Sequence, residues 1–362
     1  MRIGHIIFPG INNPGGTENY IFTFLSIFNK KKFTQTIYQA QQNDNDRIKV
    51  IPTFRLFFIK RKPVYTFSFF LNTRFLDFLK EDLLITHDYV YYLPLVWFKK
   101  TIVVSHGVRW ERPQKEQSWY NFVHWWSAKF AFKFAYSLVA NDSDFFRKLG
   151  INLKPKERMF QEIIKNRWFI PNCVDTNKFK KSQSIKSLQS LNPILVPRNI
   201  VRGRGIHLAI LAFKEFSKKF KNTSLVICGD FSDVEYKYEI FNLIKDLDLI
   251  GKVYFIGSID WNLMPRIYSS SFMTVIPTLY EEGTSLAALE SMSCGTPVVS
   301  TTIGGLLDLP TLHASPETKD LAEKMIFCFK KRNNFSKQQQ SEVRKIYNLE
   351  NFEKAWLSVL KD

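Results

Sequence analysis

Two glutamates, Glu282 and Glu290, flank a short segment whose residue types could bind a phosphorylated ligand. Thr284 or Ser285 can cap the start of a helix, and the run Leu-Ala-Ala-Leu-Glu that follows favours one. The first turn of that helix points unpaired backbone N–H groups and the positive end of the helix dipole toward a ligand over Gly283. Proteins hold phosphate in this way without a metal ion. Further along the helix, Glu290 could reach a pair of ligand hydroxyls.

The same helix must be short. Gly295 suits the left-handed conformation that closes a helix, and Pro297 forbids its continuation. Eight residues of helix would separate the α-carbons of Glu282 and Glu290 by about 12 Å. The two carboxyls of a glycosidase lie roughly 5–9.5 Å apart. We therefore favour separate roles for the two glutamates over a hydrolytic pair.

Three arginines lie between a strand expected at Pro193–Val196 and a helix expected over Ile206–Phe220. They are Arg198, Arg202 and Arg204. Guanidinium groups make strong, charge-assisted hydrogen bonds to phosphate. They lie at the carboxyl end of an expected parallel strand, where such sheets bind ligands, so phosphate binding is one interpretation and ordinary surface arginines beside a turn are the other.

A glycine loop, Asn12–Glu18, follows the first expected strand. Gly15 and Gly16 would let the backbone approach a ligand closely, and Thr17 would cap the next helix. The loop lacks the G-x-G-x-x-G pattern, which disfavours binding of a nicotinamide dinucleotide. A plain turn is the alternative interpretation.

Two histidines, His87 and His106, end buried strands expected at Leu83–Thr86 and Thr101–Ser105. Both strand ends belong to the edge where parallel sheets place ligands. We regard both side chains as candidate site residues, with a structural role in the core as the alternative.

The run from Glu282 to Gly305 resembles the donor-site signature of retaining glycosyltransferases of the GT-B fold, glycosyltransferase family 4. The matching features are two glutamates with seven residues between them, the turn at Gly295, Pro-Val-Val and Gly-Gly. Arg198 and Arg204 are similar in position to the arginine and lysine that clamp the donor phosphates in this family, although Arg202 remains an alternative for the second.

The resemblance implies roles for particular residues. Catalytic roles are expected for His106, Glu282, Arg198 and Arg204. The donor is expected to contact Gly15, Gly16, Arg198, Arg204, Glu282, Gly283, Thr284, Ser285, Leu286 and Glu290. Candidates on the acceptor side are Thr17 and His87. No residue is expected to bind a metal ion.

The resemblance also implies an activity: metal-independent, retaining transfer of a sugar of the hexose type from a nucleotide diphosphate. UDP- and GDP-linked sugars are the expected donors, as substrates, and no cofactor is expected. The expected acceptor is a glycan or lipid-linked molecule, in the biosynthesis of cell-envelope polysaccharide or glycolipid. Two alternatives stay open, a GT-B nucleotide-sugar isomerase and a non-enzymatic module that binds a sugar nucleotide.

Short apolar strands alternate with helical stretches in both halves, which predicts an α/β protein with two Rossmann-like, doubly wound domains. In a GT-B fold these domains face each other across a cleft. We expect an acceptor-binding domain at 1–180, a linker at 181–190 and a donor-binding domain at 191–340. The last segment, 341–362, is expected to form a C-terminal helix that packs back on the first domain.

Basic residues are concentrated in the first half. Residues 1–190 carry 30 lysines and arginines against 14 aspartates and glutamates, and residues 191–362 carry 21 against 19. This asymmetry suggests an anionic partner for the first half, either a charged acceptor or the anionic surface of a membrane, with a merely solvated charged surface as the alternative. The aromatic and basic stretch Phe54–Tyr65, with Trp119, Trp125 and Trp126, is the candidate for membrane docking. No recognisable nucleic-acid-binding module is present, and we expect no nucleic-acid partner.

The remaining composition sets the expected compartment. The N-terminus resembles a first strand rather than a signal peptide, and no apolar run is long enough to span a membrane. The four cysteines have no paired spacing. We expect a cytoplasmic protein, with peripheral attachment to the inner face of the membrane as an extension of that expectation.

Overall fold

The computed structural model describes residues 1–7, 15–29, 33–39, 49–52, 58–59, 62–63, 78–97, 100–111 and 118–361. Three features of the sequence therefore lie outside the described residues, wholly or in large part. They are the end of the first expected strand at Phe8, the start of the glycine loop at Asn12–Pro14, and most of the aromatic stretch Phe54–Tyr65.

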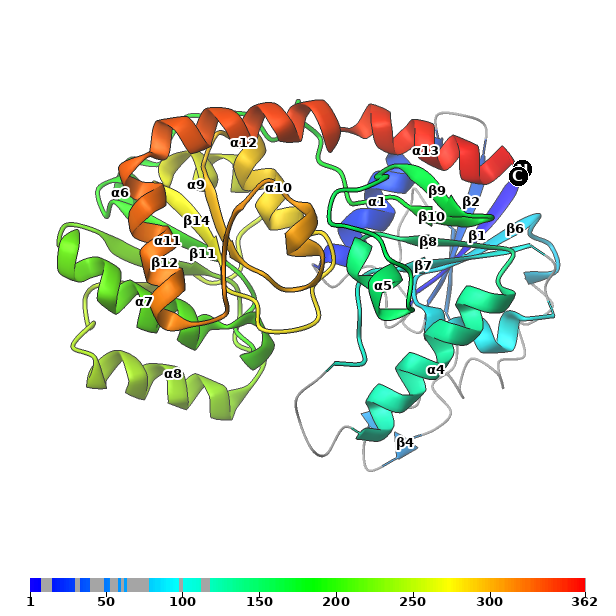
Figure 1. Cartoon of the computed structure of the whole chain (residues 1–362), viewed down its shortest axis with the longest axis horizontal. Coiled ribbons are helices and arrows are strands. Elements are labelled where there is room, and N and C mark those ends of the chain that lie inside the picture. The colour runs from blue at the N-terminus through cyan, green and yellow to red at the C-terminus, as the bar shows by residue number, and fades with distance from the viewer. Residues whose placement is uncertain are drawn as a thin grey trace. The chain divides into compact units, whose positions relative to one another are not determined.

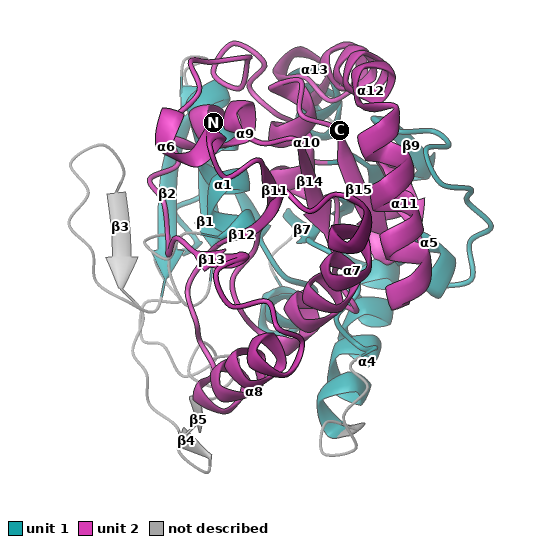
Figure 2. Ribbon diagram, turned by 90° about the vertical axis from the view of Figure 1, so that its left-hand side faces the viewer, with its two compact units in different colours: residues 1–171, 353–362 teal, residues 172–352 magenta. Residues whose placement is uncertain are grey.

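The chain divides into two compact units, coloured separately in Figure 2. The first comprises Met1–Pro171 and Glu353–Asp362, and the second comprises Asn172–Phe352. The division after Pro171 comes earlier than the expected linker at 181–190. That segment lies within the second unit because Ser182 and Ile185 donate backbone hydrogen bonds to the hydroxyls of Ser269 and Ser270, at 2.9 and 2.8 Å.

The first unit contains an eight-stranded sheet in the order β3-β2-β1-β6-β7-β8-β10-β9. All neighbours are parallel except β10 and β9. Its strands are β1 (Arg2–Ile6), β2 (Thr34–Gln39), β3 (Lys49–Pro52), β6 (Leu83–Thr86), β7 (Thr101–Ser105), β8 (Ser137–Ala140), β9 (Gln161–Ile164) and β10 (Arg167–Phe169). The short strands β4 (Phe58–Ile59) and β5 (Lys62–Pro63) form a separate hairpin.

Helices cover both faces of this sheet (Figure 1). They are α1 (Gly16–Phe28), the 3₁₀ helix η2 (Tyr89–Leu95), α4 (Ser118–Phe134), α5 (Ser143–Lys148) and α13 (Leu349–Lys361). The C-terminal part of α13 belongs to this unit. Trp356 is fully buried, its Nε1 donates to the hydroxyl of Tyr20 at 3.0 Å, and its ring packs edge-on against Phe24. The chain thus returns to the first unit at its end, but later than expected: residues 341–352 group with the second unit, and only Glu353–Asp362 group with the first.

The second unit contains a six-stranded parallel sheet in the order β13-β12-β11-β14-β15-β16. Its strands are β11 (Pro193–Pro197), β12 (Ser224–Cys228), β13 (Val253–Phe255), β14 (Met273–Ile276), β15 (Val298–Thr301) and β16 (Leu312–Ala314). The chain builds β11, β12 and β13 outward in one direction and then returns to place β14 on the other side of β11. This reversal is a topological switch point, where doubly wound sheets bind ligands.

Two groups of helices cover this second sheet (Figure 1). One group is α7 (Ile206–Lys219), α8 (Val234–Asp246) and α11 (Thr318–Lys330), and the other is α9 (Met264–Ser270), α10 (Leu286–Ser293) and α12 (Arg332–Ile346). The shorter helices are α6 (Lys186–Gln189), η4 (Arg202–Arg204) and η5 (Gly304–Asp308). The strands are mostly apolar, and β11, β12, β14 and β15 are buried along their whole length, as expected for a sheet covered on both faces.

Two expected helix caps are corrected by the structure. Helix α1 begins at Gly16 with Gly15 as its extended N-cap residue, so Thr17 lies inside the first turn and does not cap it. Ser285 is the N-cap residue of α10, but its side chain makes no capping hydrogen bond. The end of α10 is as expected, since Gly295 adopts a left-handed conformation with φ of 80°.

None of the described helices is both long enough and apolar enough to cross a membrane.

Candidate functional site

The loops that follow β11 and β14 build the candidate donor site in the second unit. Because these strands are parallel neighbours, their carboxyl ends lie at the same edge of the sheet. Arg198 comes directly after β11, and Thr278 comes two residues after β14. Both loops therefore deliver their side chains to the switch point between the strands.

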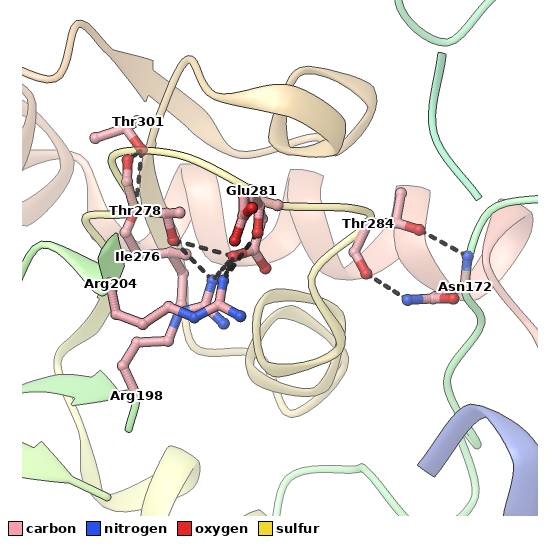
Figure 3. A network of polar contacts seen from close by, with 9 residues as sticks. Asn172, Arg198, Arg204, Ile276, Thr278, Glu281, Thr284 and Thr301 are labelled. Atoms are coloured by element: carbon pink, nitrogen blue, oxygen red, sulfur yellow. Dashed lines mark hydrogen bonds and ion pairs between the residues drawn. The ribbon is translucent and has the colours of Figure 1, made fainter. Parts of the chain in front are cut away.

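One carboxylate gathers two of the predicted arginines. Oε2 of Glu282 lies 2.6 Å from Nη2 of Arg198 and also forms an ion pair with Nη1 of Arg204. The hydroxyl of Thr278 donates to the same oxygen at 3.1 Å and accepts from Arg198 at 2.9 Å. Figure 3 shows the two guanidinium groups side by side. The cluster has two positive charges and one negative charge, so it carries a net positive charge that suits an anion.

Burial and charge act in opposite directions on Glu282. Its side chain is only 7% exposed. Burial alone would raise the pKa of this carboxyl, but the charges of Arg198 and Arg204 and the hydrogen bonds of Arg198 and Thr278 hold the pKa below its usual value. Glu282 is therefore ionised at neutral pH.

Two buried polar atoms beside this cluster lack hydrogen-bond partners in the described part of the chain. They are Nε of Arg198 and the hydroxyl oxygen of Ser285 at the start of α10. Buried donors without partners are rare because each costs roughly 1–3 kcal/mol. Both can donate, and together with the free N–H groups of the first turn of α10 they form a set of donors suited to phosphate oxygens.

Glycines allow the loops of the site to pack without gaps. Gly205 has φ of 68°, and a Cβ there would lie 1.9 Å from the carbonyl oxygen of Pro277. Gly304 has φ of 51°, and a Cβ there would lie 2.1 Å from the carbonyl oxygen of Glu282. Gly205 thus holds the arginine loop against the loop after β14, and Gly304 supports the backbone of Glu282 from behind. The Gly-Gly pair in the sequence signature serves this close approach.

Thr284 connects the donor loop to the start of the second unit. The backbone N–H of Asn172 donates to the Thr284 hydroxyl at 2.8 Å, and the side-chain amide donates to the Thr284 carbonyl at 2.5 Å (Figure 3). Nothing in the spacing of the sequence reveals that Asn172 has a partner 112 residues away. Both hydrogen bonds position the loop immediately before Ser285.

Glu290 lies inside the second unit with two aromatic donors. Its carboxylate accepts from Nε1 of Trp261 at 2.8 Å and from the hydroxyl of Tyr268 at 2.9 Å. Burial raises the pKa of Glu290 to about 7, although these hydrogen bonds and the charge of Lys178 oppose the rise. Sequence analysis missed Trp261 and Tyr268, because no motif surrounds them. Lys178 stacks on Trp261, with Nζ 3.1 Å from the ring centre.

Arg202, the alternative to Arg204 at the donor phosphates, lies elsewhere in the second unit. It pairs with Glu239 on α8 at 2.5 Å, and both side chains are 45% exposed. Arg204 supplies the second guanidinium at Glu282.

The other predicted residues lie in the first unit. Nδ1 of His87 is 3.3 Å from Nε2 of His106, so the structure brings these two together. His87 is 3% exposed and His106 is partly buried. Gly15, Gly16 and Thr17 form the start of α1, where the N–H of Asn19 already bonds the carbonyl of Gly15.

Among the residues that the structure describes, His, Cys, Asp and Glu side chains form no group of three suited to a metal ion.

The fold and these loops define the class of protein. The architecture is that of GT-B proteins, and it matches the crystal structure of HepE from Anabaena in complex with UDP and glucose. The TM-score is 0.78 at 16% sequence identity, over 100% of this chain and 99% of that chain.

The sequence of the second unit is similar to known glycosyltransferases. Residues 177–344 match the family described as glycosyl transferases group 1. An uncharacterised glycosyltransferase of Methanocaldococcus jannaschii is 30% identical over 131 residues, which are 36% of this chain and 32% of that protein. The O-antigen chain mannosyltransferase RfbU of Salmonella typhimurium is 26% identical over 137 residues, 38% of this chain and 35% of that protein. Each match spans about a third of the relative's length.

Proposed function

We propose that this protein is a retaining glycosyltransferase of family 4 that moves a sugar from a nucleotide diphosphate to an acceptor. One observation carries the proposal. The net positive cluster of Arg198 and Arg204 around Glu282 contains the buried Nε of Arg198, and the buried hydroxyl of Ser285 lies at the start of α10; neither atom has a hydrogen-bond partner among the described residues. A donor diphosphate supplies the anionic oxygens that Nε of Arg198 and the Ser285 hydroxyl lack.

The chemistry follows from charge. When the bond between sugar and diphosphate breaks, negative charge grows on the departing phosphate, and fixed cations stabilise that charge most strongly when they are already in place. Arg198 and Arg204 are these fixed cations, so the reaction needs no metal ion. Glu282 then directs its second carboxylate oxygen toward the hydroxyls of the sugar. The departing phosphate oxygen takes the proton of the acceptor hydroxyl, so no separate carboxylate base is required.

Glu290 binds the ribose in this proposal. A carboxylate accepts hydrogen bonds from two neighbouring hydroxyls, and Glu290 is buried within the same unit as the phosphate-binding loop. The donor is a UDP- or GDP-linked sugar. The Anabaena structure with bound UDP supports UDP, and the mannosyltransferase relative supports a hexose as the transferred sugar.

The first experiment is a calorimetric titration of the purified protein with UDP, GDP and ADP in the presence of EDTA. Binding of one nucleotide that weakens in Glu290→Ala supports the proposal and identifies the base. NMR of the anomeric proton of the product then tests retention. Conversion of the donor to an isomeric nucleotide sugar without an acceptor would instead establish the isomerase. A Glu290→Ala variant that keeps its full function would favour a simple binding module.

We further propose that the acceptor is a glycan or lipid-linked molecule of the cell envelope, met at the anionic inner face of a membrane. Helix α4 supports this location, since one side of it exposes large aromatic side chains. Trp119, Phe122 and Trp126 are 75%, 53% and 44% exposed. The basic side chain of Lys129 lies 3.9 Å from the ring centre of Trp125 on the same side. Aromatic rings prefer the headgroup region of a bilayer, and lysines there bind anionic lipids.

Co-sedimentation with vesicles tests this location. The protein is expected to bind vesicles that contain phosphatidylglycerol and to bind phosphatidylcholine vesicles weakly. Trp119→Ser with Phe122→Ser should reduce the binding, and Trp97→Ser, which changes a tryptophan 87% exposed but outside α4, should not. Equal binding to both kinds of vesicle would contradict the proposal.

A further inference from the structure

Three histidine rings and one glutamine form a continuous line of hydrogen bonds in the first unit. Nε2 of His5 lies 3.0 Å from Oε1 of Gln35, and Nδ1 of His5 lies 3.1 Å from Nε2 of His87. Nδ1 of His87 lies 3.3 Å from Nε2 of His106. The rings are nearly parallel, with interplanar angles of 22° and 15°. We call these four residues the histidine chain.

The register of the sheet explains why these residues meet. Gln35, His5, His87 and His106 belong to β2, β1, β6 and β7 or their ends, which are consecutive parallel neighbours. Gln35 pairs with Ile3, which is two residues before His5 on the same strand. His5 pairs with Ile85, which is two residues before His87. Thr86 pairs with Val103, so the same register places His87 opposite Val104, which is two residues before His106. Steps of two keep all four side chains on one face of the sheet.

Aromatic side chains cover the face of the sheet that carries the histidine chain. Phe24 packs edge-on against His5 with ring centres 5.2 Å apart, and Tyr20 packs edge-on against His106 at 4.9 Å. Burial lowers the pKa of His5 to about 4 and of His106 to about 3, and it lowers the pKa of His87 well below the usual value. All three rings are therefore neutral at physiological pH.

A neutral imidazole has one N–H donor and one acceptor nitrogen, so a line of such rings has only two arrangements. If Gln35 accepts at its oxygen, His5, His87 and His106 are each protonated at Nε2, and Nδ1 of His106 remains an acceptor. If the amide of Gln35 donates, each ring reverses. Nε2 of Gln35 donates to Oδ1 of Asn29 at 2.5 Å, which directs its oxygen toward His5.

We propose that Gln35 acts as a positioning residue that fixes the tautomer of His106 through His5 and His87, so that Nδ1 of His106 accepts a hydrogen bond from a substrate hydroxyl. The identity of the substrate hydroxyl, on the sugar or on its acceptor, rests on the proposed function. The tautomer of His106 does not, because all members of the histidine chain lie within one unit of the free protein.

NMR of the ring nitrogens tests the tautomer directly. In protein labelled with ¹⁵N-histidine, protonated and unprotonated ring nitrogens resonate in separate regions, and His106→Asn assigns the relevant signals. The wild-type spectrum is expected to show His106 protonated at Nε2. Gln35→Met removes the acceptor and should give both tautomers, whereas Gln35→Glu retains an acceptor and should preserve the wild-type pattern. A wild-type His106 protonated at Nδ1, or a spectrum unchanged in Gln35→Met, would overturn the proposal.

Kinetics test the consequence for the substrate. Gln35→Met should raise KM for the sugar substrate about twofold if the two tautomers are equally populated, because only the form with an unprotonated Nδ1 accepts the bond, and Gln35→Glu should restore the wild-type KM. Wild-type KM in Gln35→Met with the tautomers mixed would contradict the role of His106 Nδ1. Absence of any transfer or nucleotide binding in the wild type would instead reject the proposed function and leave the NMR result intact.

Discussion

Arg198, Arg204 and Glu282 satisfy two opposing requirements of a protein without its ligand. A site for a diphosphate needs cations, and buried cations without partners are costly. Glu282 meets this cost by pairing with Arg198 and Arg204 while leaving Nε of Arg198 without a partner among the described residues. In the proposed function, the diphosphate of the donor therefore meets guanidinium groups that Glu282 already holds in position.

Arg198 and Arg202 provide a matched pair of variants. Arg198→Leu is expected to weaken UDP binding at least tenfold, since a hydrogen bond to a charged group contributes about 1.5–3 kcal/mol. Arg202→Leu should leave the affinity within about twofold, because an exposed ion pair such as that with Glu239 contributes roughly 0–1 kcal/mol. Calorimetry measures both, and uridine without phosphates should bind both variants alike. Equal losses for the two variants would refute the assignment.

The pKa of Glu290 gives donor binding a pH dependence. In the free protein burial raises this pKa to about 7, and hydroxyl donors of a ribose favour the ionised form. Binding therefore releases a proton, and affinity rises as the pH rises through the free pKa. Between about pH 6 and pH 8, the affinity for a UDP-sugar should increase about tenfold, because the ionised fraction rises by that factor.

Glu290→Gln is the control for this pH effect. Its amide does not titrate, so its affinity should be lower at high pH and nearly constant over the same range. A UDP-sugar is the ligand of choice, because its diphosphate does not change charge there. A wild-type affinity that falls with pH would contradict the role of Glu290.

At the scale of the elements, two loops define the donor site by their close approach, and the glycine at their contact is the sensitive position. Gly205→Ala places a methyl group 1.9 Å from the carbonyl oxygen of Pro277, which must move the arginine loop or the loop after β14. Gly251→Ala is the matched control, with φ of 76° and no atom within 4 Å of the added methyl.

Both variants bear the strain of a left-handed alanine, about 1–2 kcal/mol. Only Gly205→Ala adds the clash, so its free energy of unfolding should fall further and its UDP affinity should fall as well. Urea unfolding followed by calorimetry checks both. Equal stability of the two variants would show that the loops move apart freely.

The sequence predicts the bounds of an element where local residue patterns determine them. Strands such as β6 and β7 are apolar runs between polar turns, and α10 has both a helix-forming run and a closing glycine, so their bounds follow from neighbouring residues. The family resemblance predicted a role for Arg204 at the donor phosphates, but its ion pair with Glu282 was not predicted. Trp261 beneath Glu290 and Asn172 at Thr284 could not be predicted, because tertiary packing alone joins them.

The histidine chain shows the same limit in another form. Its members lie on four strands at steps of two, and the pattern becomes visible only when the strand order and register are known. Residue type predicted Thr17 as the cap of α1, but Gly15 holds that position. Ser285, one of the two predicted caps of α10, does hold the N-cap position, but its side chain makes no capping hydrogen bond.

At the scale of the whole molecule, the end of the chain belongs to the first unit although it follows the second in sequence. Glu353–Asp362 group with Met1–Pro171, and Trp356 completes the packing of α1. Tyr20 connects this contact to the histidine chain, because its hydroxyl accepts from Trp356 and its ring packs on His106. The C-terminal helix therefore supports the face of the sheet that carries His106.

Trp356→Ala should consequently destabilise the first unit rather than the second. Removing a buried tryptophan costs about 3–5 kcal/mol, and Tyr20 and Phe24 lose their partner. Hydrogen exchange should accelerate in β1 and α1 and remain near wild type in β11, β12 and β14. Trp119→Ala is the control, because Trp119 is 75% exposed and its loss should leave exchange unchanged in both units. Faster exchange confined to the second unit would mean that α13 stabilises the segment it follows in sequence, and the assignment of the C-terminal helix to the first unit would fail.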